Sequence, residues 1–189
     1  VNQMARYSHF TLHDPETAPG ESAEQLRNAE QQLGMIPHLY RVLAESPQTL
    51  EAYDTLNGLF TNTSFDATEQ TVVWQSISVE HGCHYCVPAH TAIAHAANVP
   101  EEVTEALRNR TPLPDERLEA LRTFTLSLVR RRGFVDEASL ELFLRAGFTT
   151  RHVLEIVLGI AQKTISNYTN HLAQTPVDPE FERFAWSET

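Results

Sequence analysis

The sequence predicts an all-α fold built from many short helices, and three observations support this. Apolar residues recur at helical spacing along nearly the whole chain, and no segment alternates as a strand would. Residues that favour helix starts precede most of these apolar runs. Prolines and glycines separate most of the runs from one another. With 41% apolar residues in 189, the chain can bury a sizeable core without disulfides.

The N-terminal part is expected to be an extended arm followed by a helix. Residues 1–20 carry two prolines and a glycine, whereas residues 21–189 are expected to form one domain. Ser22 and Gln25 have the spacing of a capping box, which would open a helix that ends near Gly34.

The next three helices have start signals of their own. A short helix is expected after Pro37. Ser46 and Pro47 are typical of a cap and a first helical position, and they precede a helix that extends to about residue 60. Asp66 and Glu69 form a second capping box, for a helix that reaches about residue 81.

The remaining helices follow Gly82, which separates the preceding helix from one that carries both cysteines. Aromatic residues and prolines fill the C-terminal tail, which is expected to be a loop packed onto the body of the protein. The expected helices are 83–97, a short one from residue 100, 115–132, 136–146 and 149–172.

The charge of the chain argues against two kinds of partner. The net charge is −11, and the one basic run, Arg130 to Arg132, lies where cations suit a helix end. We therefore expect no binding to nucleic acid or to an anionic membrane. No apolar run approaches the roughly 20 residues of a membrane span, and residues 1–6 do not resemble a signal peptide, so a cytoplasmic protein is expected.

The sequence Cys83-His84-Tyr85-Cys86, followed by His90, predicts thiol chemistry. These cysteines are the only two in the chain, and at ~100° per residue both would share a helix face with His90. A helix N-terminus and an imidazole both favour the reactive thiolate. Pro88 indicates that the regular helix begins nearer Cys86, which would leave Cys83 on an irregular and more exposed lead-in.

Other interpretations of these residues remain open. Free cysteines often pack in a core without reacting. Cys83, Cys86, His90 and His95 could together bind a metal, although His95 turns away from the shared face. A reactive dithiol without a metal or a cofactor is the preferred hypothesis.

Several neighbouring residues have both a catalytic and a structural interpretation. Glu80 is a candidate base or a polar helix end, and Glu69 is a candidate base or simply the partner of its cap. Tyr85 could donate a hydrogen bond to a substrate or pack against the core. His81 and His84 flank Gly82 and are expected to be exposed, although either could tune the thiols. Three residues are expected on the polar side of the last helix, as oligomer contacts or caps: Asn167, Asn170 and His171.

Residues 79–91, VEHGCHYCVPAHT, resemble the N-G-C-x-Y-C-V-x-A-H stretch of the alkylhydroperoxidase D-like (AhpD-like), carboxymuconolactone decarboxylase superfamily. Residues 33–40, LGMIPHLY, and the segment from residue 155 to residue 178 resemble flanking parts of the family, so that the resemblance covers roughly residues 30–185. It implies a helical fold that assembles as trimers or hexamers, and a dithiol peroxidase activity.

The resemblance also implies roles for individual residues. Cys86 would attack the peroxide, Cys83 would resolve the product as a disulfide, and His90 would relay a proton. The glutamate that the family uses in this relay is replaced here by Thr71, so that Glu80 or Glu69 would have to supply a carboxylate.

The predicted function is therefore a dithiol peroxidase or thiol–disulfide oxidoreductase. Its expected partners are a small hydroperoxide, a thiol reductant of unknown identity and further copies of the chain. Two alternatives stay open. One is a redox sensor or scaffold with little turnover, for which the absent glutamate is an argument. The other is a lactone decarboxylase, which would not need two cysteines.

Overall fold

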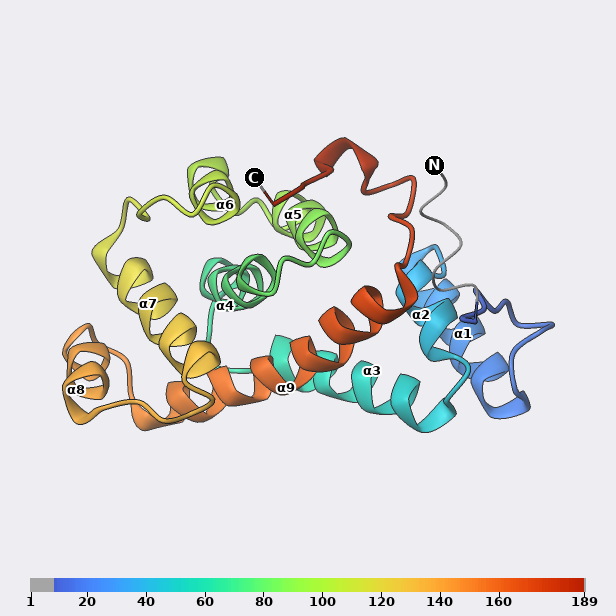
Figure 1. Ribbon diagram of the computed structural model, residues 1–189, viewed down its shortest axis with the longest axis horizontal. Helices are drawn as coiled ribbons and strands as arrows, with labels where there is room; N and C mark the ends of the chain where they lie inside the picture. The colour runs from blue at the N-terminus through green and yellow to red at the C-terminus, as the bar shows by residue number, and fades with distance from the viewer. Residues whose placement is uncertain (1–8, 189) are drawn as a thin grey trace.

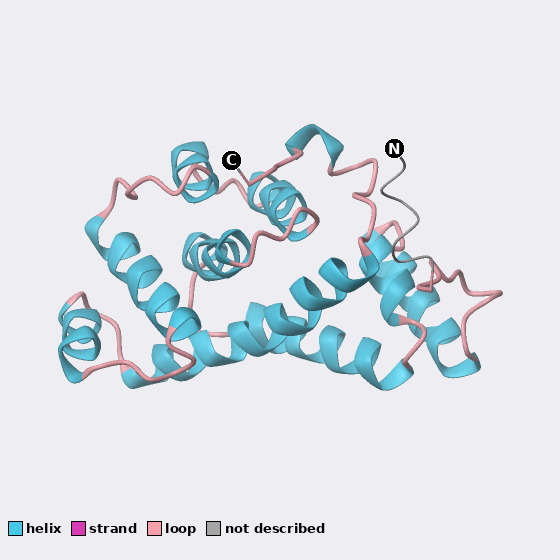
Figure 2. Ribbon diagram, in the orientation of Figure 1, coloured by secondary structure: helices cyan, strands magenta, loops and turns pink. Residues whose placement is uncertain are grey.

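The structure, a computed structural model, describes residues 9–188. Over these residues it consists of helices and loops with no strand (Figure 2), which confirms the predicted all-α class. The helices are α1 (Gly20–Leu33), α2 (His38–Leu43), α3 (Pro47–Thr61), α4 (Ala67–Glu80), α5 (Cys86–Ala96), α6 (Glu101–Arg108), α7 (Glu116–Arg130), α8 (Glu137–Arg145), α9 (Thr150–Ala173) and the short 3₁₀ helix η2 (Glu182–Phe184).

Helix α4 forms the centre of the fold. All nine residues from Thr71 to Val79 are buried. A helix buried on every side must be surrounded by others, and α5, α6, α7 and α9 all pack against α4. Figure 1 shows α4 and α5 end-on above the long helix α9, with α7 crossing beside them. The segment that follows α4 is thereby fixed inside the molecule.

The crossing of α9 over α3 and α4 depends on Gly159. A Cβ atom at this position would lie 2.7 Å from the Phe60 ring and 3.1 Å from a Val73 methyl group. Because real Cβ atoms do not come so close to neighbours, only glycine allows this approach. The close contact places the second half of α9 beside the residues that precede and begin α5.

The predicted helix starts have different outcomes. The Asp66–Glu69 capping box is present at the start of α4, and the Ser46 side chain caps α3 as expected. The predicted cap at Ser22 is wrong, because α1 begins two residues earlier at Gly20 and Ser22 is buried inside it. Residues 9–19 contain no helix, and the rest of the expected arm, residues 1–8, lies outside the described residues.

The C-terminal segment packs onto the body, as predicted. After α9 the chain turns back and arches over α5 (Figure 1). The Trp186 indole donates a hydrogen bond to the backbone oxygen of Arg108 at 3.1 Å, and the Phe181 ring lies edge-on to Tyr85 at 6.4 Å. Within residues 9–188, none of the helices is both long and apolar enough to span a bilayer.

Candidate active site

The turn between α4 and α5 sets the position of the first cysteine. Gly82 has φ of 64°, the left-handed conformation that closes a helix. The N–H of Gly82 bonds to the Val79 oxygen at 3.1 Å, and that of Cys83 bonds to the Ser78 oxygen at 2.9 Å. These two hydrogen bonds together form a Schellman motif, which closes the C-terminus of many helices. Cys83 therefore emerges directly from the buried end of α4, and its side chain is fully buried, so the expected exposed lead-in is wrong in that respect.

The second cysteine begins the next helix, as the proline predicted. Cys86 is the first residue of α5, and Pro88 falls in its first turn, where a proline is tolerated. The backbone N–H of Cys86 donates to Cys83 Sγ at 3.2 Å, and Asn170 Nδ2 of α9 donates to Cys86 Sγ at 3.2 Å. Both cysteines are free thiols in this structure. The two sulfurs thus lie together at a helix N-terminus, with an amide donor directed at the second one.

The surroundings of the two sulfurs divide them into a thiolate and a thiol. Burial alone would raise the pKa of Cys86, but a hydrogen bond from the Cys83 thiol, the charge of Lys163 and the amides of Asn170 and Asn167 outweigh it and lower that pKa to about 5. The pKa of Cys83 is raised, chiefly by its hydrogen bond to Cys86 and by burial. At neutral pH Cys86 is therefore the thiolate of the pair, and Cys83 keeps its proton.

His90 is buried one helical turn beyond Cys86. Its Nε2 accepts a hydrogen bond from Lys163 Nζ at 2.6 Å, and its ring packs on Trp74 with the ring centres 4.9 Å apart. Its Nδ1 is buried with no hydrogen-bond partner among the described residues. Burial, and then the charge of Lys163, hold the pKa of His90 well below its usual value. The imidazole is therefore neutral at physiological pH.

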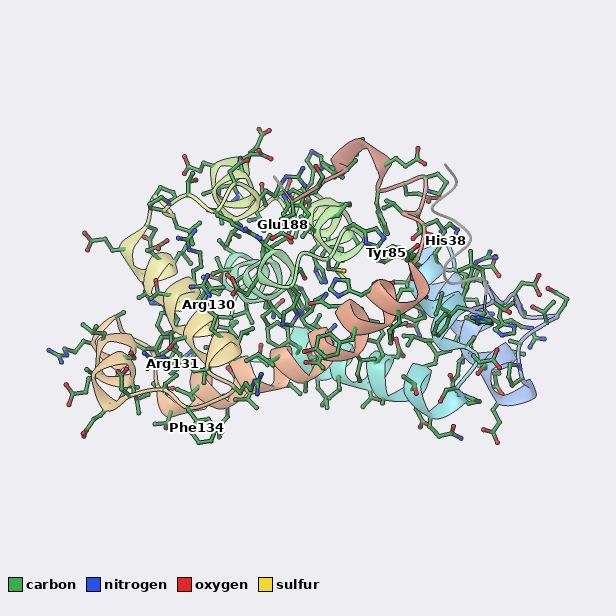
Figure 3. The ribbon with its side chains drawn as sticks, in the orientation of Figure 1. His38, Tyr85, Arg130, Arg131, Phe134 and Glu188 are labelled. Carbon is green, nitrogen blue, oxygen red and sulfur yellow. The ribbon has the colours of Figure 1, made fainter. Side chains whose placement is uncertain are left out.

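Tyr85 is held by a network that joins the dithiol turn to the C-terminal segment. Its hydroxyl donates to the Asp178 carboxylate and accepts from the backbone N–H of Leu39 at 3.2 Å. Asp178 also accepts from the backbone N–H of His38 at 3.0 Å. Figure 3 shows His38 and Tyr85 close together near the end of α9. The Tyr85 hydroxyl thus donates to Asp178 of the protein itself, and the packing interpretation of Tyr85 is the one that the structure supports.

The two candidate glutamates, Glu80 and Glu69, make contacts away from the cysteines. Glu80 accepts two hydrogen bonds from Arg130 of α7, at 2.7 and 2.8 Å, and these hold the pKa of its carboxyl below the usual value. Glu69 accepts hydrogen bonds from the backbone N–H of Asp66 and from Arg117. It lies 11 residues before Glu80 on α4, which is about 16 Å along the helix axis. Thr71 donates its hydroxyl proton to Ala67 within α4. None of the hydrogen bonds of these three side chains involves a sulfur atom of Cys83 or Cys86.

A cavity of about 270 Å³ opens onto Cys86. A cavity of roughly 150 Å³ is enough to hold benzene, so an organic molecule larger than one ring would fit. Its walls are mostly apolar, and its polar groups lie at Cys86 and around it. The lining residues are Leu33, Met35, Pro37, Leu39, Tyr40, Tyr53, Asn57, Tyr85, Cys86, Ala89, His90, Ile93, Lys163 and Phe181.

The remaining candidates have varied surroundings. Asn167 and Asn170 are fully buried beside the dithiol, so their expected place on an exposed polar face is wrong. His81 Nδ1 donates to Asn167 Oδ1 at 2.9 Å, and His84 Nε2 donates to the backbone oxygen of Thr175 at 3.0 Å. The ring of His95 lies against Phe184 of the C-terminal segment and not beside the cysteines. Within residues 9–188, no three His, Cys, Asp or Glu side chains converge as a metal site requires.

Comparison with known families supports the resemblance seen in the motif. Residues 47–125 match the model of the carboxymuconolactone decarboxylase family. A crystal structure described as an alkylhydroperoxidase AhpD core, an uncharacterized peroxidase-related protein from Ralstonia eutropha JMP134, superposes with a TM-score of 0.81 at 20% identity. The match covers 93% of this chain and 94% of that one. These matches support the AhpD-like superfamily for this chain. The family model and the shared fold agree with the resemblance seen in residues 79–91.

Other solved structures share the AhpD-like fold. A peroxidase-related protein from Silicibacter sp. TM1040 has a TM-score of 0.78 and 19% identity, over 94% of this chain and 97% of that chain. The debrominase Bmp8, as a cysteine-to-alanine variant with 2,3,4-tribromopyrrole, has a TM-score of 0.76 and 17% identity, over 93% and 95% of the two chains. Among curated proteins, none matches the sequence. The fold is therefore shared by proteins that are described as peroxidase-related and by a debrominase.

Proposed function

We propose that this chain is a dithiol oxidoreductase that reduces hydroperoxides with an apolar body. One observation carries the proposal. Cys86, stabilised as a thiolate by its neighbours, lies at the wall of a mainly apolar cavity of about 270 Å³ with a protonated thiol, Cys83, beside it. The peroxidase-related neighbours lend support through their fold. A reducing compartment such as the cytoplasm would let the pair cycle.

The proposed cycle uses both sulfurs. The Cys86 thiolate attacks the distal peroxide oxygen, the O–O bond breaks, and a sulfenic acid and an alkoxide form. The thiol of Cys83 then attacks the sulfenic sulfur, which releases water and leaves a disulfide. A dithiol reductant restores the pair by exchange. Because the walls of the cavity are mostly apolar, we expect organic hydroperoxides to bind better and react faster than hydrogen peroxide.

Mass spectrometry and peroxide consumption test this function. One equivalent of cumene hydroperoxide should remove two hydrogens from the intact reduced chain, and dithiothreitol should support turnover. Since the chain has no other cysteine, all thiol signals come from this pair. Cys86→Ser should abolish the reaction, whereas Cys83→Ser should react once and leave a sulfenic acid that a trapping reagent labels.

Other results would point to the alternatives. Disulfide formation without turnover, under several dithiols, would favour the redox sensor or scaffold. Loss of muconolactone that survives both serine variants would favour a lactone decarboxylase. An unchanged mass after excess peroxide, in folded protein, would reject the peroxidase.

Reductive debromination is a second candidate, and the walls of the cavity favour it. Tyr40, Tyr53, Tyr85 and Phe181 present ring surfaces to the cavity beside a thiolate. Bmp8, whose fold this chain shares, is a debrominase seen with tribromopyrrole. Bromide release from 2,3,4-tribromopyrrole, measured beside peroxide consumption, separates the two reactions.

A further inference from the structure

Lys163 is an unusual residue both in the sequence and in the structure. Among the 14 Lys and Arg residues of the chain it is the only lysine. It lies in the middle of α9 and is completely buried, beside the dithiol cavity. An ammonium group has three donors, and His90 Nε2 is its one acceptor among the described residues. Such a position needs a physical reason, because burying a charge without compensation costs several kcal/mol.

The compensating charge is the thiolate. No carboxylate of the described residues lies within ion-pair distance of Lys163. Cys86 lines the same cavity wall, and the charge of Lys163 is one of the causes of its lowered pKa. Two buried groups of opposite charge thus share one site. The remaining N–H groups of Lys163 have no acceptor among the described residues, and the side chain lines the cavity that a substrate would enter.

We propose that Lys163 is both the charge partner of the Cys86 thiolate and the general acid of the reaction. A cation on α9 then takes the place of a carboxylate relay from α4, where Thr71 bonds only within its own helix. His90 has a positioning role in this arrangement, because its Nε2 holds the ammonium at 2.6 Å. The inference rests on the proposed peroxidase function for its second half only.

The proton balance closes over one cycle. When Cys86 sulfur bonds to the distal oxygen and the O–O bond breaks, the alkoxide takes a proton from the Lys163 ammonium and leaves as an alcohol. Sulfur is oxidised by two electrons and the peroxide is reduced by two. Condensation with the Cys83 thiol releases water without a net proton. Reduction by a dithiol regenerates thiol and thiolate and frees one proton, which returns to the amine.

The charge role is tested without peroxide, by the absorbance of the thiolate at 240 nm in reduced protein titrated with acid. Lys163→Met has nearly the same length without charge, and it should return the thiol toward its ordinary pKa of about 8.5. A full return to that pKa would lower the thiolate fraction at pH 7 about 30-fold, to about 3%, and the hydrogen bonds from Cys83 and Asn170, which this variant keeps, would make the loss smaller. Lys163→Arg should keep the thiolate. Arg27→Met, an exposed change on α1, removes the same charge from the chain and should have no effect.

The titration must be assigned to the correct group. The other titratable side chains around the pair are Cys83 from the turn, His90 from α5, Tyr53 from α3 and, farther out, His81 and His171. Alkylation by iodoacetamide with mass mapping assigns the titration to Cys86. An unchanged titration in Lys163→Met, with the protein folded by circular dichroism, would overturn the charge role. If the methionine variant does not fold, Lys163→Gln replaces it, since the amide can still bond to His90.

The acid role is tested by changing the leaving group. With tert-butyl hydroperoxide the leaving alkoxide needs a proton, whereas peracetic acid releases a stable acetate. After correction for thiolate fraction, Lys163→Arg should slow single-turnover oxidation by tert-butyl hydroperoxide about 10²-fold or more, and by peracetic acid much less. Equal losses for both oxidants would reject the acid role. No reaction of wild-type protein with either oxidant would instead reject the proposed function, and the titration result would stand.

Discussion

Removal of the Asn170 amide should weaken the thiolate by a calculable amount. Asn170 is completely buried on α9, and its Nδ2 donates to Cys86 Sγ at 3.2 Å. A hydrogen bond to a charged group contributes about 1.5–3 kcal/mol. Since 1.36 kcal/mol corresponds to one pKa unit, Asn170→Leu should raise the pKa of Cys86 by about 1 to 2. At pH 5 to 6 the variant should therefore react more slowly with iodoacetamide than wild type.

The fold should tolerate this change. Leucine has the same number of side-chain heavy atoms as asparagine in the same branched arrangement, and the Oδ1 atom of Asn170 has no hydrogen-bond partner among the described residues. Its removal therefore takes away one unsatisfied buried acceptor, which offsets part of the lost hydrogen bond. The assay is the 240 nm titration of reduced protein, with Asn28→Leu on the exposed face of α1 as the matched control. A titration within a few tenths of wild type would show that the amide does not stabilise the thiolate.

Three further predictions concern stability and assembly. Because the folded-state pKa of Cys86 is about 5, below its unfolded value, reduced wild type should gain stability over Cys86→Ser as pH rises from 5 to 9 and lose it as pH falls; parallel urea curves would refute this. Asp178→Ala should lower the free energy of unfolding in urea by about 2–4 kcal/mol, because the buried Tyr85 hydroxyl and the His38 N–H lose their acceptor. A loss no larger than that of the same substitution at an exposed aspartate would refute the network. The chain should be a trimer or hexamer by light scattering, and Leu154→Glu on the exposed apolar side of α9 should shift it toward a 21.3 kDa monomer; a monomeric wild type would end the prediction.

Local sequence signals predicted most of the helices because their causes are local. A capping box such as Asp66 with Glu69 satisfies backbone donors within four residues, and Gly82 closes α4 through its own left-handed conformation. Ser22 failed because its spacing also occurs inside helices, and α1 simply begins earlier. The four residues from Ser22 to Gln25 carry no information about how the helix packs against the rest of the chain, and this packing decides where it begins.

Part of the candidate site could also be predicted from the sequence, because it too depends on local structure. Cys86 and His90 lie one turn apart on α5, and the short turn before α5 brings Cys83 Sγ to the backbone N–H of Cys86. Lys163, Asn167 and Asn170 come from α9, about 80 residues later, and only the packing of α9 beside α5 places them at the sulfurs. The polarity of Asn167 and Asn170 predicted a place on the polar side of the helix, because polar side chains are usually exposed, and nothing was predicted for Lys163.

Two signals could have pointed to them. Four polar residues, Lys163, Ser166, Asn167 and Asn170, follow a helical spacing in a helix whose other sides are rich in apolar residues, and all four are buried. Lysine is also otherwise absent from the chain. Arginine serves every other cationic position, so a single lysine indicates a role that depends on giving up a proton, which arginine cannot do in proteins.

The charges around Cys86 also bear on how easily the oxidised pair is reduced. In the disulfide the sulfur carries no charge, so the Lys163 ammonium would lose its compensating partner while it stays buried. Everything that lowers the pKa of Cys86 therefore stabilises the reduced protein over the oxidised one. Dithiol proteins follow this relation: thioredoxin, with a thiol pKa of about 7, has a potential of about −270 mV, and DsbA, with about 3.5, has about −120 mV. With a pKa of about 5 for Cys86, we expect a potential between those two, measured by equilibration with glutathione. Lys163→Met should lower it toward that of thioredoxin. A wild-type potential below about −300 mV, the range of structural disulfides, would mean that the buried cation does not favour the reduced state and that the pair is not built to cycle.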